Sequence, residues 1–236
     1  MTTDYLQTTP ILDFSHPDIV ALVNQRGWRE LSAQQATSAI YDFVKDEIKF
    51  GYNADDAIPA STVLNDGYGQ CNTKGSLLMA LLRAVGIECR FHGFTIYNAL
   101  QRGAIPNYIM PIAPKRILHS WVEVKLEGQW INLEGFIIDA AFLSQVQSVY
   151  INCKNFSGYG IAVKNLARPN NEFDGDSTYI QAEGIADDFG VFNSPDLFFA
   201  KHGSNLKGFK KFIYRHALRH LINRHVSNIR KVGIML

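Results

Sequence analysis

Residues 66–94 have the sequence DGYGQCNTKGSLLMALLRAVGIECRFHGF, in which a cysteine stands between a glycine-rich turn and a leucine-rich run. Gly67 and Gly69 allow the backbone to turn tightly just before Cys71. After the cysteine, apolar residues recur at three- and four-residue steps and predict one apolar helix face, made of Leu77, Leu78, Leu81, Leu82 and Val85. Gly86 stands where a left-handed C-terminal cap is expected. The pattern predicts a helix that begins at Cys71 and ends before Gly86.

A thiol at the start of a helix has chemical consequences. The first N–H groups of a helix lack helical partners, and the helix dipole is positive at that end. Both effects favour thiolate over thiol, so the pKa of Cys71 is expected below the usual value of about 8.5. The position of Cys71 therefore indicates an activated nucleophile.

A histidine that can exchange a proton with this thiol lies in residues 118–135, LHSWVEVKLEGQWINLEG. The aromatic and β-branched residues after His119 predict a strand, and Glu127-Gly128 predicts a two-residue turn into a second strand. In that register His119 faces position 136, so Glu134 is its diagonal neighbour on the same face of the sheet. Cys71, His119 and Glu134 are therefore predicted as nucleophile, base and orienting carboxylate.

These two motifs resemble those of the transglutaminase-like cysteine enzymes, in the form of a bacterial-type stand-alone domain, and the resemblance covers about residues 36–139. It rests on the glycine-flanked cysteine, the leucine-rich helix with its LLRAVGI exit, and the H-x-W-V-E-V hairpin. The resemblance implies an α+β fold with a papain-like core, in which the nucleophile-bearing helix packs on an antiparallel sheet. It also implies acyl transfer through a thioester on Cys71, with His119 first as general base and then as general acid.

The third catalytic position departs from the family pattern. The family usually has aspartate at the end of the second hairpin strand, where this chain has Glu134. Asp139 is the alternative orienting residue, although its place before AAFLSQVQSVY favours a role as helix N-cap. Both assignments stay open at this stage.

Several nearby residues are candidates for binding substrate. The oxyanion of an acyl intermediate is expected to receive the N–H of Cys71 and a second donor, for which Gln70 and Tyr68 are the candidates. Trp121, His92 and Tyr108 are candidate substrate contacts, although a satisfied structural role is the more common one for a histidine such as His92. The proline-containing residues 97–116 form either an ordered, substrate-selecting loop over the cleft or a surface connection.

Composition indicates a globular protein without disulfide cross-links. The chain has 236 residues, of which 47% are apolar, and it can bury a substantial core without disulfides. Its three cysteines show no disulfide or metal spacing, so a reducing compartment is expected, and Cys89 is expected to be a small buried residue. The N-terminal residues lack a signal-peptide pattern and no run of about 18 apolar residues occurs, which predicts a soluble cytoplasmic protein.

No cofactor and no metal are expected. FDGDSTYIQAEG, residues 173–184, is rich in acidic residues like a calcium loop. However, Tyr179 stands where the loop needs glycine and Ile185 where it needs its closing carboxylate. Residues 50–69 are expected to form a wall of the cleft, with Asp55, Asp56 and Pro59 exposed or at a turn. Residues 151–200 show no sustained period.

The charge of the chain divides it into two parts. Residues 1–200 are expected to form the catalytic domain and have 14 Lys and Arg against 22 Asp and Glu, a net charge of −8. Residues 201–236 have nine basic residues and no acidic one, and their pattern predicts a basic amphipathic helix. Its apolar stripe, from Leu206, Phe209, Ile213 and Ala217 onward, is expected to dock on the acidic domain. The alternative is an anionic partner, either a membrane surface or a nucleic acid.

Three functions remain open from the sequence. The favoured one is cysteine-dependent hydrolysis of an amide or peptide bond in a peptide, a protein or a small molecule, since no site for a second acceptor is visible. The second is an amide-forming acyltransferase with the same three residues, because the first half of the reaction is identical. The third is an inactive binding module that uses the basic tail.

Overall fold

The computed structural model describes residues 5–234. Its helical segments of five residues or more are α1 (Pro17–Arg26), α2 (Ala33–Asp42), the π-helical η2 (Phe43–Glu47), α3 (Ala60–Asp66), α4 (Cys71–Ala84), α5 (Ala140–Val149), α6 (Pro195–His202), α7 (Gly208–Ile213), the π-helical η7 (Tyr214–Leu218) and α8 (Arg219–Val232). Its strands are β1 (Lys49–Phe50), β2 (Tyr68–Gly69), β3 (Cys89–Tyr97), β4 (Arg116–Leu126), β5 (Gln129–Leu133), β6 (Lys154–Gly158), β7 (Ile161–Asn165) and β8 (Ile185–Phe192). This mixture of helices with a mainly antiparallel sheet is the predicted α+β class.

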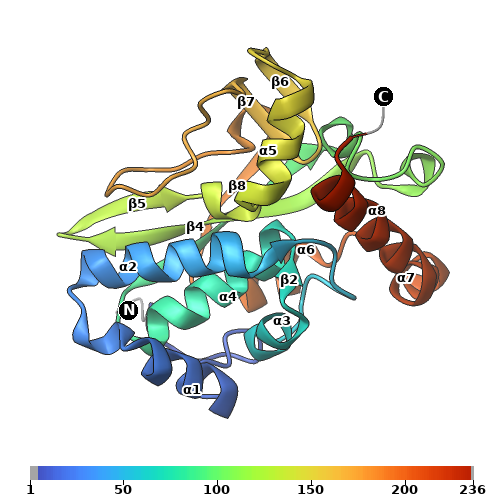
Figure 1. Ribbon diagram of the computed structural model, residues 1–236. Coiled ribbons are helices and arrows are strands. Elements are labelled where there is room, and N and C mark those ends of the chain that lie inside the picture. The colour runs from blue at the N-terminus through green and yellow to red at the C-terminus, as the bar shows by residue number, and fades with distance from the viewer. Residues whose placement is uncertain (1–4, 235–236) are drawn as a thin grey trace.

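The central sheet is antiparallel, with strand order β5-β4-β3-β8. The predicted hairpin is confirmed, since Leu126 pairs with Gln129 and Val122 with Leu133. Its turn residues have φ angles of 50° at Glu127 and 82° at Gly128, as a two-residue turn requires. Figure 1 shows α1 to α4 gathered on one side of β4 and β5, with α5 and the β6–β7 hairpin on the other.

One edge of β4 is only partly covered. β3 pairs with β4 along its length, from Arg116 to Val124, whereas β5 pairs only with Val122 to Leu126. Residues 116–121 therefore have an edge that no strand covers among the described residues. The start of α4 and part of the C-terminal segment lie along this edge, as the contacts of the functional site show.

Helix α4 is the most buried helix of the fold. Every residue from Cys71 to Arg83 is buried, and Leu77 to Leu82 are 0% exposed. The prediction of a single apolar face was wrong, because α1, α2 and α3 contact this helix together with β4. Its predicted end is confirmed, since Gly86 has a φ of 81° and Ile87 N–H donates to the carbonyl of Leu82. A helix enclosed in this way holds its first residue rigidly.

Lys74 lies inside this packing, one turn after Cys71. Its Nζ donates to the carbonyl oxygens of Lys45 and Ile137, at 3.0 and 3.1 Å. Burial lowers the pKa of Lys74 to about 7, although the carboxylates of Asp139 and Asp46 oppose the shift. Lys74 is therefore largely neutral in the folded protein at mildly basic pH.

The replacement Lys74→Met is expected to change how stability depends on pH. Between about 7 and about 10.4 an unfolded lysine keeps a proton that the folded one has lost, so stability rises with pH. The free energy of unfolding of wild type should rise relative to that of K74M by up to about 1.4 kcal/mol per pH unit in this window. Urea unfolding of both proteins across the window measures the difference, and Lys49→Met, at an exposed lysine, is the control. If the free energies of unfolding of wild type and K74M change with pH in the same way, Lys74 does not titrate as expected.

The C-terminal segment is helical but differs from the predicted single helix. It consists of α7, η7 and α8, and the side chains it buries are Ile222, Val226 and Ile229. The predicted docking stripe was wrong at Phe209, Ile213 and Ala217, which are exposed. The π-helical turn at 214–218 interrupts the α-helical period on which that stripe was based.

The segment contacts the rest of the chain through polar groups. Lys211 forms an ion pair with Asp55, and the guanidinium of Arg219 donates to the hydroxyl of Tyr68. Asn223 exchanges two hydrogen bonds with the backbone of Tyr52, at 2.7 and 2.9 Å. These contacts hold α7 and α8 at one end of the molecule (Figure 1).

Candidate active site

Cys71 is the first residue of α4 and lies at a pocket of about 120 Å³. Its side chain is buried, and Gln70, the N-cap residue, lines the same pocket. The remaining lining residues are Tyr52, Ala54, Asp55, Asp56, Gln101, Ile105, Pro114, Ile117, Leu118, Ser204, Asn205, Leu206, Lys211, Tyr214 and Ile222. The predicted loop 97–116 and the C-terminal segment thus both form walls of the pocket that holds the cysteine.

The environment of Cys71 opposes ionisation. Burial raises the pKa of the Cys71 thiol well above its usual value, and the nearby Asp56 carboxylate raises it further. The backbone N–H groups of Asn72 and Ser120 point to the sulfur and lower the pKa, but by less. The predicted pKa depression was therefore wrong for this closed arrangement, because desolvation outweighs the effect of the helix start. A base must take the thiol proton before the sulfur can attack.

His119 and Glu134 are fully buried next to one another. His119 Nε2 lies 3.8 Å from Glu134 Oε1, and both side chains are 0% exposed. The other oxygen of Glu134 accepts hydrogen bonds from the backbone N–H groups of Ile180 and Gln181, each at 2.9 Å. Glu134 is thus fixed by the segment before β8 and leaves Oε1 for the histidine. The hairpin and this segment together place the carboxylate where the sequence predicted it.

The imidazole has unused hydrogen-bonding capacity. Neither ring nitrogen of His119, nor Glu134 Oε1, makes a hydrogen bond within residues 5–234. The ring packs edge-on against Phe94, at 4.8 Å between centroids. No hydrogen bond joins Cys71 to His119 in this arrangement, although Ser120, the next residue, reaches the sulfur with its N–H. Buried unpaired nitrogens are costly, and catalytic hydrogen bonds often tighten only when a substrate binds.

Asn72 connects the two chain segments that carry the cysteine and the histidine. Its Nδ2 donates to the carbonyl of Leu118 at 3.0 Å, and its Oδ1 accepts from the hydroxyl of Ser120 at 2.9 Å. These are the residues on either side of His119. The fully buried Asn72 side chain therefore fixes β4 against the start of α4. No feature of the sequence pattern pointed to Asn72.

Asp56 is a second carboxylate at the pocket. It was expected to be exposed or at a turn, but its side chain is buried and accepts hydrogen bonds from Gln70, Asn72 and Asn205, at 2.9 to 3.1 Å. Burial raises the pKa of Asp56, and these three donors partly oppose the increase. Asp56 thus organises three amide side chains around the nucleophile.

Asn205, between α6 and α7, occupies the open edge of β4. Its Oδ1 accepts from the N–H of Leu118 at 2.7 Å, and its Nδ2 contacts the carbonyl of the same residue at 3.4 Å. The side-chain amide thus pairs with Leu118 as a neighbouring strand would. It closes the pocket directly beside His119. Nothing in the sequence pattern distinguished Asn205 from other polar residues of the tail.

The two candidate oxyanion donors have different positions. Gln70 lines the pocket, but its Nε2 donates to Asp56 and its Oε1 accepts from the N–H of Asn53. The hydroxyl of Tyr68 instead accepts from Arg219, and Tyr68 is not a lining residue of the pocket. Of the two, the structure brings only Gln70 to the pocket of Cys71.

The three candidate substrate contacts lie outside this pocket. His92 is held between Glu123 and Asp188, at 2.6 and 2.8 Å, and its ring packs on buried Trp121 at 4.4 Å. Tyr108 is exposed and is not among the lining residues. None of the three lines the pocket of Cys71, and His92 has a satisfied structural role.

Asp139 is not the carboxylate beside His119. Its oxygens accept from the N–H of Phe142, which makes it the N-cap of α5, and from Arg230. The N-cap prediction is confirmed. Within the described part of the chain, no group of three or more His, Cys, Asp and Glu side chains could hold a metal ion.

Comparison with known proteins agrees with this arrangement. A family model described as the transglutaminase-like superfamily matches residues 23–135, which include Cys71, His119 and Glu134. Residues 23–135 of the chain thus resemble a transglutaminase-like domain. The match confirms the resemblance predicted from the two motifs and supports a cysteine-based enzyme. A comparison with curated proteins finds no match.

Two solved structures are similar to this chain. One is described as a "putative cysteine protease" from Cytophaga hutchinsonii, with 12% identity and a TM-score of 0.47, over 81% of this chain and 47% of that one. The other is red sea bream transglutaminase, with 14% identity and a TM-score of 0.30, over 78% of this chain and 27% of that one. This chain thus spans less than half the length of either.

The three free cysteines should react in an order that reports the closed pocket. Cys153 is the most exposed, whereas burial raises the pKa of Cys71 and raises that of the fully buried Cys89 to about 11. Iodoacetamide at neutral pH is therefore expected to label Cys153 first and Cys89 last, as peptide mass spectrometry would measure.

Opening the pocket should change this order. Asn205→Ala removes the hydrogen bonds that close the β4 edge and should speed labelling of Cys71 about fivefold or more, since a hydrogen bond contributes about 1 kcal/mol. Asn228→Ala, at an exposed asparagine of α8, should have no effect. If Cys71 of the wild type reacts before Cys153, the closed pocket is not the form present in solution.

Proposed function

We propose that this protein hydrolyses an amide or peptide bond through a thioester on Cys71. The observation that carries the proposal is the position of Cys71 at the start of α4, beside a mainly apolar pocket and next to the N–H of Ser120. The residue before Ser120 is His119, which lies beside the buried carboxylate of Glu134. The family match supports a cysteine-based enzyme but does not distinguish hydrolysis from transfer.

In the first half of the proposed reaction, His119 takes the proton of Cys71 as the sulfur attacks the carbonyl carbon. A C–S bond forms, the C–N bond breaks, and the imidazolium gives its proton to the leaving amine. Glu134, held by the backbone at 180–181, stabilises the imidazolium while it is charged. The need for a base is greater here because burial raises the pKa of Cys71.

The developing oxyanion needs hydrogen-bond donors next to the sulfur. The N–H groups of Asn72 and Ser120 point to the sulfur from two directions, and Gln70 adds a side-chain amide to the same pocket. Such donors stabilise a negative charge strongly in a site without water. In the second half of the reaction, water attacks the thioester carbon as His119 takes a water proton. The C–S bond then breaks, His119 returns the proton to the Cys71 sulfur, and the carboxylic acid is released.

A second candidate is amide formation with an amine acceptor. It is favoured by one observation: Asp55, a lining residue of the pocket, holds the ammonium group of Lys211. A pocket that holds one amine beside Cys71 is suited to hold another. The buried site also limits the access of water, which would otherwise compete with the amine.

The test is incubation with a peptide library, with and without a primary amine, followed by mass spectrometry. Hydrolysis predicts free-acid products whether or not amine is present, whereas transfer predicts amine adducts. Cys71→Ala is the control, because its thioester cannot form. If wild type and C71A give identical product profiles, the protein is a binding module and the proposed chemistry is wrong.

A further inference from the structure

We propose that the outward face of residues 207–221 binds an anionic membrane surface. This outward face consists of the exposed residues Lys207, Phe209, Lys210, Phe212, Ile213, Arg215, His216, Ala217, His220 and Leu221. None of the helices within residues 5–234 is long and apolar enough to cross a membrane, so the contact is one of a helix lying on the surface.

The apolar part of this outward face is unusually exposed. Phe209 is 75% and Phe212 is 58% exposed, and their rings stack at 6.4 Å between centroids. Ile213 and Leu221 add aliphatic side chains that are 36% and 45% exposed. Transfer of such side chains from water to the acyl boundary of a bilayer gains about 25 cal/mol for each Å² that is buried.

The charge of the outward face has one sign. Lys207, Lys210 and Arg215 are exposed and form no ion pair with an acidic residue within the described chain, and no Asp or Glu occurs after Asp196. The other basic side chains of this region, Lys211 and Arg219, turn inward to Asp55 and Tyr68. The positive charge left outside is therefore available to an anionic surface, where each such side chain contributes about 1 kcal/mol.

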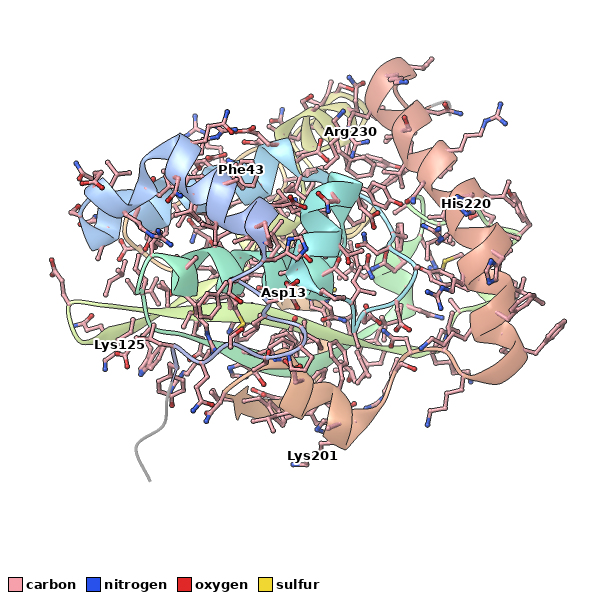
Figure 2. All side chains as sticks on the ribbon, turned by 90° about the horizontal axis from the view of Figure 1, so that it is seen from below. Asp13, Phe43, Lys125, Lys201, His220 and Arg230 are labelled. Carbon is pink, nitrogen blue, oxygen red and sulfur yellow. The ribbon has the colours of Figure 1, made fainter. Side chains whose placement is uncertain are left out.

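The inner face of the segment is already in use. Ile222, Val226 and Ile229 are buried, and Asn223 is bound to the backbone of Tyr52. The aromatic residues of the outward face therefore cannot turn into the core without loss of these contacts. Figure 2, which labels His220 on this helix, shows side chains that project from it away from the body.

The shape and chemistry of the outward face favour a bilayer over a nucleic acid. Single-stranded nucleic acids are bound in a positively charged groove with aromatic side chains along it. Here the aromatic and basic residues lie on a helix at one end of the molecule, and the aliphatic Ile213 and Leu221 offer nothing to a base or a phosphate (Figure 1). An interfacial amphipathic helix combines these same features.

The test is co-sedimentation of the full chain with vesicles. Binding is expected to phosphatidylcholine mixed with phosphatidylserine, weakened by salt, and not to phosphatidylcholine alone. Phe209→Ser with Phe212→Ser should weaken binding about tenfold or more, and Lys207→Gln and Lys210→Gln about fivefold each. The matched controls are Ile151→Ser and Lys154→Gln, at exposed residues far along the chain, and both should bind like wild type.

Three results would overturn the proposal. The first is equal binding to both vesicle types, and the second is unchanged vesicle binding of the Phe209→Ser/Phe212→Ser variant. The third is that wild type binds no vesicles but binds a single-stranded oligonucleotide, and that this variant no longer binds the oligonucleotide. Sedimentation velocity without vesicles tests whether the outward face instead binds a second copy of the chain. Self-association that the same substitutions abolish would assign the outward face to that second copy. The readout is binding, so it is independent of whether Cys71 is a nucleophile.

Discussion

Replacement of Cys71 by alanine is expected to reduce turnover of an amide substrate by about 10⁴-fold or more, with no thioester trapped. The sulfur is the only atom of the proposed set that forms a bond to substrate, so no neighbour can replace it. His119→Ala should give a loss of similar size, because burial raises the pKa of the Cys71 thiol and leaves it protonated without a base. Single-turnover kinetics with acyl-enzyme detection by intact mass measures both effects.

The effect of Glu134→Gln should be smaller but specific. Gln keeps the shape of the side chain and can still accept from Ile180 and Gln181, but it loses the charge that stabilises the imidazolium. A fall of about 10²-fold in kcat with little change in KM is expected, together with a shifted pH profile. Glu123→Gln is a matched control: this buried carboxylate of β4 pairs with Arg90 and His92. Equal activity of E134Q and wild type would remove Glu134 from the mechanism.

The sequence was informative about the site where local patterns decide the structure. Two-residue turn chemistry determined the register of the β4–β5 hairpin, and the glycine-flanked cysteine identified the start of α4. These are short-range effects that a single sequence expresses. The proximity of Glu134 to His119 followed from the hairpin register, whereas the position of Cys71 relative to this pair did not.

The parts that were missed depend on contacts between distant residues. β8 and α6 lie in residues 151–200, where no period was visible, because β8 is a half-exposed edge strand without an alternating pattern. Asn205 reaches Leu118 across the fold, and Asp56 is buried only because three amide side chains meet it. The ionisation of Cys71 also depends on burial, which the helix start alone could not reveal.

The largest stability effect is expected at the ion pair of Asp139 and Arg230, which joins three parts of the fold. Asp139 accepts from Phe50 N–H at 2.8 Å and caps α5 through Phe142, while Arg230 donates to both of its oxygens at 3.0 and 2.6 Å. Arg230 also donates to the carbonyl of Phe50. The pair thus connects β1, α5 and α8, and both side chains are mostly buried.

Asp139→Ala should therefore lower the free energy of unfolding by about 3–5 kcal/mol, since it leaves the Arg230 charge buried without a partner and removes a helix cap. Asp139→Asn keeps much of the cap and should cost less. Arg230→Met, which removes the charge but keeps an unbranched side chain, is the complementary variant. If D139A and Lys49→Met have the same urea midpoint, the pair does not stabilise the fold.

The acid dependence of this pair has a definite sign. Burial alone raises the pKa of Asp139, but the hydrogen bonds and charge of Arg230, the N–H of Phe50 and the charge of Lys74 outweigh burial, so that its pKa lies below the usual range. A carboxyl with a depressed folded pKa stabilises the protein above its unfolded pKa of about 3.9 and loses that contribution as pH falls through the folded value. The stability difference between wild type and D139N should therefore shrink as the pH falls below about 4. A difference that instead grows on acidification would mean that Asp139 is protonated in the folded protein, and that Arg230 is held by its backbone contact alone.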